Sequence, residues 1–280
     1  MLNVVYFIIL SILGTLLFGY TMWRTQLPRG RVLTIFFVIS GISYILEYVI
    51  FVLFHSYDYY PKVLKEQWFD SLLGAIVSQA MVVPVIGMCI VAFHLRFYWI
   101  LMFAALLMGI EEYFLHLGIY EQHWWKTGYT GILVIIGFSI GKWWNHKLTQ
   151  VKPWVEWFNI YFAIGLITQT TAYFIVVLMH SHLYSPGWFA NSIRDSVAMD
   201  ALFWFIHSIL GTFLIQFWFK WYSMLLLYIV DFWVFTFFEQ SGVLRFGMHW
   251  NAALLALVPA VLAILSQRLY VRLSKGFSAQ

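Results

Sequence analysis

The sequence predicts an all-α fold: a polytopic membrane helical bundle of nine transmembrane helices, made of one extra N-terminal helix and two parallel four-helix repeats. Three observations lead to this prediction. Apolar residues make up 62% of the 280 residues and charged residues only 10%, with a mean hydropathy of +0.82, which is typical of a chain solvated by lipid. Nine apolar stretches are long enough to cross a bilayer. The second half of the chain also repeats part of the first.

A transmembrane helix needs about 20 mostly apolar residues. Stretches of this kind, separated by charged residues or proline, are expected at residues 2–23, 33–56, 71–93, 97–117, 127–145, 157–180, 196–218, 221–240 and 251–270. The first stretch lacks the positively charged start and the small-residue cleavage site of a signal peptide. We therefore expect it to be retained as a helix.

Lysine and arginine set the expected orientation, because they are enriched in the cytoplasmic connections of membrane proteins. Alternate connections carry most of the basic residues, namely Arg24, Arg29, Arg31, Arg96, Lys142, Lys147, Lys152, Lys220, Arg268, Arg272 and Lys275. The connections between them hold mixed or acidic charge. This pattern predicts a multi-pass protein of the plasma membrane, with its N-terminus outside and its C-terminus in the cytoplasm.

Charge and motif content exclude several function classes. The net charge of +4 is explained by orientation and by attraction to anionic inner-leaflet lipid, and no basic run is dense enough to indicate nucleic acid. The expected partners are the lipid bilayer and a small solute, ion or lipid ligand, and the oligomeric state is left open. No phosphate-binding glycine loop is present, which argues against ATP-driven transport within this chain. The single cysteine, Cys89, excludes an intrachain disulfide.

An ungapped offset of 125 residues indicates a duplication. Residues 36–71 placed on residues 161–196 give 13 identities in 36 positions. The matched pairs include His55/His180, Ser56/Ser181, Pro61/Pro186, Asp70/Asp195 and Ser71/Ser196, and Pro28/Pro153 extends the register. Each repeat contains an even number of helices, so both should have the same orientation, related by an axis along the membrane normal. The expected organisation is an additional helix at 1–27, repeat 1 at 28–150, and repeat 2 with a basic cytoplasmic tail at 151–280.

In this topology the polar residues that both repeats keep lie at the outer membrane face. They are His55, Asp70, Glu112 and His123 in repeat 1, and His180, Asp195, Glu239 and His249 in repeat 2. Two histidines with two carboxylates suit a borderline divalent metal ion, the one cofactor that the sequence indicates. The same groups suit a proton relay, since histidine titrates near neutral pH. A structural role is the third interpretation, in which Asp70 and Asp195 cap the helices that follow them.

Another set of polar residues is expected deep in the membrane and is not matched between the repeats. Glu47 falls within the second helix, His207 within the seventh and Asp231 near the centre of the eighth. Because a carboxylate at that depth is costly, Glu47 and Asp231 should face the bundle interior, be protonated or pair. These three residues are the catalytic or transport candidates, and interhelical hydrogen bonding is the structural alternative.

One segment resembles a known family. Its residues are Glu111-Glu112-Tyr113-Phe114, Leu117-Gly118-Ile119-Tyr120 and His123-Trp124-Trp125-Lys126-Thr127-Gly128-Tyr129. This stretch, residues 111–129, is similar to one in small, Trp-rich, four-helix membrane proteins of spore-forming Firmicutes. The resemblance implies a bacterial plasma membrane, with this chain as a duplicated version that carries an extra first helix. It implies no activity.

Three classes of function remain open from the sequence. The leading hypothesis is an integral plasma-membrane protein that binds or transports a small solute, ion or proton at the interface of the two pseudo-twofold repeats. The alternative is a membrane-embedded enzyme that acts on a lipid or isoprenoid by carboxylate acid–base chemistry. The third is a non-catalytic assembly or regulatory subunit of the membrane. The sequence does not decide whether the protein is an enzyme.

Overall fold

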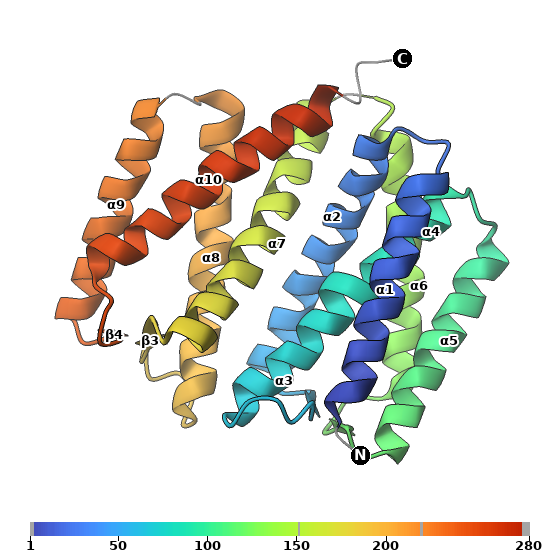
Figure 1. Ribbon diagram of the computed structural model, residues 1–280, viewed down its shortest axis with the longest axis horizontal. Coiled ribbons are helices and arrows are strands. Elements are labelled where there is room, and N and C mark those ends of the chain that lie inside the picture. The colour runs from blue at the N-terminus through green and yellow to red at the C-terminus, as the bar shows by residue number, and fades with distance from the viewer. Residues whose placement is uncertain (1–2, 151, 219–220, 276–280) are drawn as a thin grey trace. The chain divides into compact units, whose positions relative to one another are not determined.

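A computed structural model describes residues 3–150, 152–218 and 221–275 of the chain (Figure 1). Lys220 and the tail from residue 276 therefore lie outside the described residues. The described chain is helical apart from four short strands, which confirms the predicted all-α class. It divides into two units: the first comprises the chain up to Glu156 together with its end from Leu273, and the second spans Trp157–Arg272. Each unit has its own hydrophobic core.

The first unit contains five long helices, two of which include a π-helical turn. Its elements are α1 (Val4–Arg24), α2 (Arg29–Glu47), the π turn η1 (Tyr48–Leu53), β1 (Tyr57–Tyr59), α3 (Gln67–Ile76), the π turn η2 (Val77–Val82), α4 (Val83–Ala92), α5 (Phe97–His116), β2 (Tyr120–Gln122) and α6 (Thr127–Lys147). Because the π turns are continuous with their neighbours, α2–η1 is one helix and α3–η2–α4 is another.

The second unit has the same order of elements without a counterpart of α1. Its elements are α7 (Pro153–Met179, which begins in the first unit), β3 (His182–Tyr184), α8 (Ser192–Phe217), α9 (Trp221–Gln240), β4 (Leu244–Phe246) and α10 (Ala252–Lys275). Elements recur at an offset of 124 or 125 residues. The clearest case is Gln67–Ala92, which corresponds to Ser192–Phe217.

Seven helices among the described residues are long and apolar enough to cross a membrane. They are Val4–Arg24, Arg29–Leu53, Gln67–Ala92, Phe97–His116, Pro153–Met179, Ser192–Phe217 and Tyr222–Gln240. These helices support the multi-pass membrane character. Helix α6 is not among them, and the apolar part of α10, Ala252–Ser266, is shorter. The expected count of nine spans therefore stays a prediction.

Helix α4 is the most buried helix of the first unit. It packs against α1, α2, α5 and α6, and every residue from Pro84 to Ala92 is buried. Ile90 packs with Phe138 of α6, and Met88 packs with Val32 of α2. A helix surrounded on all sides has no polar face, which explains why this segment is apolar all round.

The π turn η2 has a cause in the sequence. Pro84 has no backbone N–H and its ring crowds the carbonyl four residues earlier, so a helix deforms in the turn before a proline. Segment η2 lies at this place. In the second unit the position 125 residues after Pro84 is Ile209, and α8 runs without interruption from Ser192 to Phe217.

Each unit has a two-stranded antiparallel ladder that joins two of its connections. In the first unit Tyr57 lies opposite Gln122 and Tyr59 opposite Tyr120. In the second unit β3 pairs with β4 in the corresponding register. Asn3 Nδ2 donates to the carbonyl of Tyr60 over 2.8 Å. The start of α1 therefore lies at the strand end of the first unit, where α3 begins and α5 ends (Figure 1).

The opposite end of the first unit carries basic residues. Arg31 donates to Oδ1 and to the carbonyl of Asn145 over 2.7 and 2.6 Å. Lys142 Nζ donates to the carbonyl of Leu95 over 2.8 Å. The unit thus has a strand end and a basic end, a polarity compatible with the orientation expected from the basic residues.

Asp70 and Asp195 do not cap the helices that follow, so this structural interpretation was wrong. Helices α3 and α8 begin three residues earlier than the aspartates, at Gln67 and Ser192. The carboxylates instead accept hydrogen bonds of 2.7–3.0 Å from backbone N–H groups of the preceding loops. Asp70 accepts from Lys62, Val63 and Leu64. Asp195 accepts from Gly187, Trp188 and Phe189. The two loops are therefore held in the same way, 125 residues apart.

Replacing either aspartate should destabilise its unit. Asp70→Ala removes three charge-assisted hydrogen bonds, so the free energy of unfolding should fall by about 2 to 4 kcal/mol. Asp195→Ala should have an effect of the same order. Thermal unfolding in detergent, followed by tryptophan fluorescence, measures both. Glu66→Ala is the matched control, because this exposed carboxylate makes no cap bond. Equal shifts for Asp70→Ala and Glu66→Ala would contradict this role.

Candidate functional site

A cavity of about 150 Å³ lies inside the first unit. Two carboxylates, Glu47 and Glu111, and three tyrosines, Tyr57, Tyr59 and Tyr120, contribute to its lining. Most of the remaining lining is apolar and comes from α1, α2, η2, α5 and α6. No lysine, arginine or histidine is among the lining residues. The cavity therefore holds two acidic groups without a basic side chain beside them.

Glu47 lies where α2 passes into η1, and it is 8% exposed. The hydroxyl of Tyr57 donates to Glu47 Oε2 over 2.6 Å. Oε1 is buried and makes no hydrogen bond of ordinary length to the residues that the structure describes, although the Gln79 side chain lies close enough to interact with the carboxylate. Only six residues separate Glu47 from the helix end at Leu53, a rise of less than about 10 Å. Glu47 thus lies nearer the strand end than the middle position that the sequence predicts.

Glu111 was not among the residues expected from the sequence, which named its neighbour Glu112. Gln122 Nε2 donates to Glu111 Oε1 over 2.7 Å, whereas Glu112 is exposed. Helical spacing carries the signal that distinguishes the two. The buried positions of α5 are Ile100, Ala104, Leu107 and Phe114. A stripe with steps of three and four residues includes position 111 and excludes position 112.

Tyr59 and Tyr120 line the cavity together with the two carboxylates and interact with both of them. Burial raises the pKa of Tyr59 well above its ordinary value, and the charges of Glu47 and Glu111 raise it further. The pKa of Tyr120 is raised by burial first, then by Tyr59 and by the same two carboxylates. The two rings lie 4.9 Å apart between centroids. At neutral pH both hydroxyls are therefore protonated and able to donate hydrogen bonds inside the cavity.

The π turns help to shape the cavity wall. Glu47 directly precedes η1, and Gln79, which lies in η2, also lines the cavity. A π turn uses an extra residue per turn and is frequent at functional sites. Gly74 allows β1 to approach α3, because a Cβ atom there would lie 2.5 Å from Tyr59 Cβ. These local features are absent from the pattern of apolar stretches, so the sequence-based prediction missed the wall that they form.

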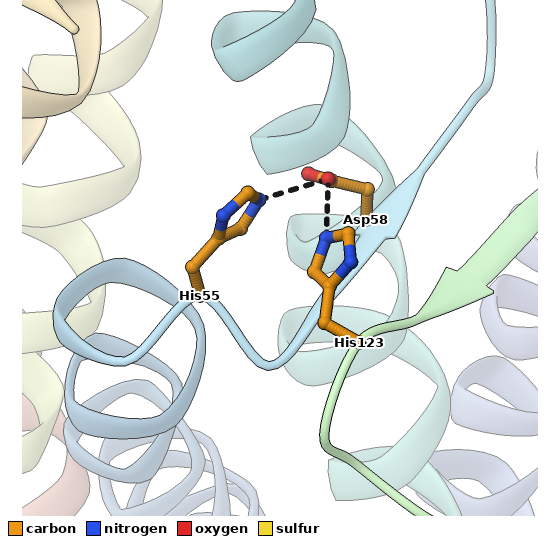
Figure 2. A group of neighbouring side chains, drawn as sticks. All are labelled: His55, Asp58 and His123. Atoms are coloured by element: carbon orange, nitrogen blue, oxygen red, sulfur yellow. Dashed lines mark hydrogen bonds and ion pairs between the residues drawn. The ribbon is translucent and has the colours of Figure 1, made fainter.

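His55 and His123 meet at Asp58 (Figure 2). The Nε2 atom of each histidine lies 2.9 Å from Asp58 Oδ2. The Asp58 side chain is 4% exposed, whereas the histidines are about one-third exposed. Side chains alternate along a strand, so Tyr57 and Tyr59 line the cavity while Asp58, between them, faces the histidines. Strand β1 thus has a cavity face and a histidine face.

The structure brings together only part of the ligand set expected in repeat 1. His55 and His123 come together, but Asp70 accepts loop N–H groups and Glu112 is exposed. The carboxylate between the histidines is Asp58, which was not among the ligands expected from the sequence. The alternating polar pattern Tyr57-Asp58-Tyr59 is typical of a short strand and is the signal that could have identified it.

The ligand set expected in repeat 2 does not come together among the described residues. His180, Glu239 and His249 are exposed, and Asp195 holds its loop. The part of the chain that the structure describes contains one cluster of three His, Cys, Asp or Glu residues suited to a metal ion, and it is in the first unit.

Backbone geometry identifies the counterparts of the first-unit cluster in the second unit. His180 has a φ of +46°, close to the +47° of His55. The N–H of Gly247 donates to the carbonyl of Ser181 just as the N–H of His123 donates to that of Ser56. Gly247, and not His249, is therefore the counterpart of His123. The expected correspondence of His249 to His123 was wrong, because it followed side-chain identity rather than backbone pairing.

The deep polar residues of the second unit form buried pairs. His207 Nε2 lies 3.1 Å from Asp231 Oδ2, and each side chain is 4% exposed. His207 Nδ1 is buried without a hydrogen-bond partner among the described residues. Another pair, absent from the sequence-based candidates, joins His182 Nε2 to Asp200 Oδ1 over 3.1 Å. Asp231 thus faces the interior of its unit and has a partner.

Tyr120 is expected to keep its proton in the folded protein after ordinary tyrosines have ionised. Its folded pKa is raised, by burial above all, whereas the unfolded value is about 10. The stability contributed by neutral Tyr120 is therefore fully present below about pH 10 and is lost as the pH rises towards the folded pKa, because the unfolded chain releases the proton first.

An alkaline titration of tyrosinate absorbance tests this expectation. Tyr120→Phe should leave the absorbance gained by the folded protein unchanged and should reduce only the absorbance gained on unfolding. Tyrosine fluorescence and circular dichroism, recorded in parallel, separate ionisation from unfolding. A smaller absorbance change in the folded variant would contradict a raised pKa.

Comparison with known proteins finds no family model, no curated protein and no solved structure that matches the chain. Function therefore has to be inferred from the site itself, from the geometry and chemistry of named residues. The strongest features for this purpose are the cavity with its two carboxylates and the cluster of His55, Asp58 and His123.

Proposed function

We propose that this protein is a multi-pass membrane protein that binds a small cationic solute or protons in the cavity of the first unit and moves them across the membrane. The observation that carries this proposal is the pair Glu47 and Glu111 in a largely apolar cavity whose lining includes no basic side chain. Ionisable groups within membrane helices are costly and mark ion or proton pathways by default.

The chemistry of the lining favours a positively charged occupant. The buried Oε1 of Glu47 makes no hydrogen bond of ordinary length to the described residues, and a bound proton or cation would compensate the charge of this carboxylate. The rings of Tyr57, Tyr59 and Tyr120 surround the same space, and aromatic faces attract cations. A carboxylate pair with aromatic neighbours therefore suits a small amine or a proton better than an anion.

The size of the cavity argues against a large substrate. A volume of about 150 Å³ equals roughly five water molecules at their volume in the liquid, or one benzene-sized molecule. A whole lipid or isoprenoid molecule exceeds this volume. The alternative of a lipid-modifying enzyme also relied on Glu47 and Asp231 as acid and base. Asp231 is not among the residues that line the cavity, and the second carboxylate there is Glu111. We therefore place binding or transport ahead of the enzyme.

The proposal includes a duplicated architecture in which the first repeat keeps the site. The positions that correspond to Glu47, Gln79 and Glu111 hold Ala172, Trp204 and Phe235, and all three of these counterparts are buried. Alanine, tryptophan and phenylalanine at these positions replace the carboxyl and amide groups of the first unit. The sequence-based hypothesis put the site at the interface of the repeats. We instead propose that it lies within repeat 1.

The finer features of the sequence-based hypothesis remain part of the proposal. They are nine spans, a bacterial plasma membrane with the N-terminus outside, and kinship with Trp-rich four-helix proteins of spore-forming Firmicutes. The basic end of the first unit, with Arg31 and Lys142, supports the orientation. If the protein transports neither protons nor a cationic solute, a non-catalytic membrane subunit is the remaining interpretation.

Glu47→Gln and Glu111→Gln should each reduce transport. A hydrogen bond to a charged group contributes about 1.5–3 kcal/mol, so the flux should fall by about 10- to 100-fold. The assay uses proteoliposomes of the full chain, with proton flux read by an entrapped pH-sensitive dye and methylammonium uptake read by isotope. Glu112→Gln is the matched control, because it neutralises the exposed neighbour of Glu111.

Thermal unfolding of each variant in detergent checks that it is folded. Two results would contradict the proposal. One is wild-type flux of both probes no greater than in empty liposomes. The other is equal flux in the two cavity variants and in Glu112→Gln.

A further inference from the structure

We propose that His55, Asp58 and His123 form a binding site for one divalent transition-metal ion, with Zn²⁺ as the best-suited ion. This inference goes beyond the proposed function and does not rest on it. The three candidate ligand atoms, one ring nitrogen of each imidazole and one carboxylate oxygen, all lie within 4.8 Å of one another. Figure 2 shows both imidazoles directed at the same carboxylate.

The donor set is chemically selective. Two imidazole nitrogens with one carboxylate suit Zn²⁺ and its neighbours, whereas Mg²⁺ and Ca²⁺ prefer sites made of oxygen alone. Three protein ligands leave a fourth position for water or another ligand, as in zinc sites that are not purely structural. The one-third exposure of each histidine gives the ion a route in from solvent.

The geometry needs only a small opening to accept the ion. Each Nε2 atom lies 2.9 Å from Asp58 Oδ2. Bonds of about 2.0–2.1 Å to Zn²⁺ put tetrahedral ligand atoms about 3.3 Å apart, so each Nε2 atom must move away from Asp58 Oδ2 by about 0.4 Å. Rotation of side chains about their χ angles supplies a movement of that size without displacing the backbone.

The surrounding backbone holds the three ligands in place. The N–H of His123 donates to the carbonyl of Ser56, next to His55 in the chain, over 2.9 Å. Asp58 lies in the β1–β2 ladder, and Ser71 Oγ donates to Asp58 Oδ1 over 3.3 Å. The second carboxylate oxygen thus has a partner that orients the first, an arrangement usual around metal ligands.

The second unit supplies a natural control. His180 has the same backbone conformation as His55, but Leu183 stands at the position of Asp58 and Gly247 at that of His123. The left-handed conformation is therefore a property of this turn and does not by itself indicate a ligand. What distinguishes the first unit is the convergence of three donor atoms.

Binding of one Zn²⁺ per chain is the expected result. Full-length protein in detergent, with any polyhistidine tag removed and treated with a chelator, is titrated with Zn²⁺ by calorimetry. Loss of a residue that only hydrogen-bonds to a metal ligand weakens metal binding by roughly 10- to 100-fold. His55→Asn and His123→Gln each remove a ligand itself, so each should weaken Zn²⁺ binding by more than that. Asparagine is chosen at position 55 because it tolerates a positive φ. His180→Asn is the matched control and should bind as the wild type does.

Co²⁺ provides a second readout that does not depend on the variants folding. Bound to the wild-type site, Co²⁺ should give the intense visible absorption of four-coordinate cobalt, and Zn²⁺ should displace it. The proposal is overturned if wild-type protein gives only the weak spectrum of hydrated Co²⁺. It is equally overturned if Zn²⁺ binding is the same in the wild type and in a folded His55→Asn/His123→Gln variant, which would leave a hydrogen-bonded cluster without a metal.

Discussion

The short antiparallel pairing of β1 with β2 is the interaction on which the arrangement of the first unit depends. Helix ends in a membrane protein leave backbone N–H and C=O groups that need partners. The ladder satisfies part of this need by joining the connection after α2 to the connection after α5. Because side chains alternate along a strand, the same pairing directs Tyr57 and Tyr59 into the cavity and Asp58 away from it. Three residues of strand thus organise two different sites.

The two units show how one backbone plan can carry different chemistry. The aspartate that holds the loop, the serine that accepts the strand N–H and the left-handed histidine recur 125 residues apart. These features belong to the connections and are independent of what the helices enclose. Within the helices the counterparts diverge, from Glu111 to Phe235 and from Gln79 to Trp204. Most residues that recur in both units therefore hold the connections, whereas the residues that line the cavity of the first unit differ.

Much of the architecture could be predicted from the sequence. Composition and apolar stretches predict a multi-pass helical chain, because lipid permits few polar residues on a spanning helix. Pairing His55 with His123 at one end was also within reach, since the topology puts both on the same side. The prediction of Asp70 as their partner was wrong, because shared polar residues were taken for ligands when they hold a loop.

The cavity was harder to predict for local reasons. Apolar stretches locate helices but not their π turns. Pro84 is the residue from which η2 could have been predicted. Glu111 and Glu112 are equivalent by composition, and only the buried stripe of α5 separates them. Tyr57 and Tyr120 are brought together by strand pairing between connections that lie more than 60 residues apart. Contacts of that kind follow from the folded backbone, which no local pattern specifies.

Gly247 prevents the second unit from acquiring the histidine of the first unit by a single substitution. A Cβ atom at this position would lie 1.8 Å from the carbonyl oxygen of His180, so no residue larger than glycine fits without a shift of the main chain. Single substitutions could restore an aspartate in place of Leu183, but not a histidine opposite it. The asymmetry is thus locked into the main chain. Engineering a second His–Asp–His cluster would require transplanting the whole segment around β2, since residue-by-residue exchange meets this steric barrier.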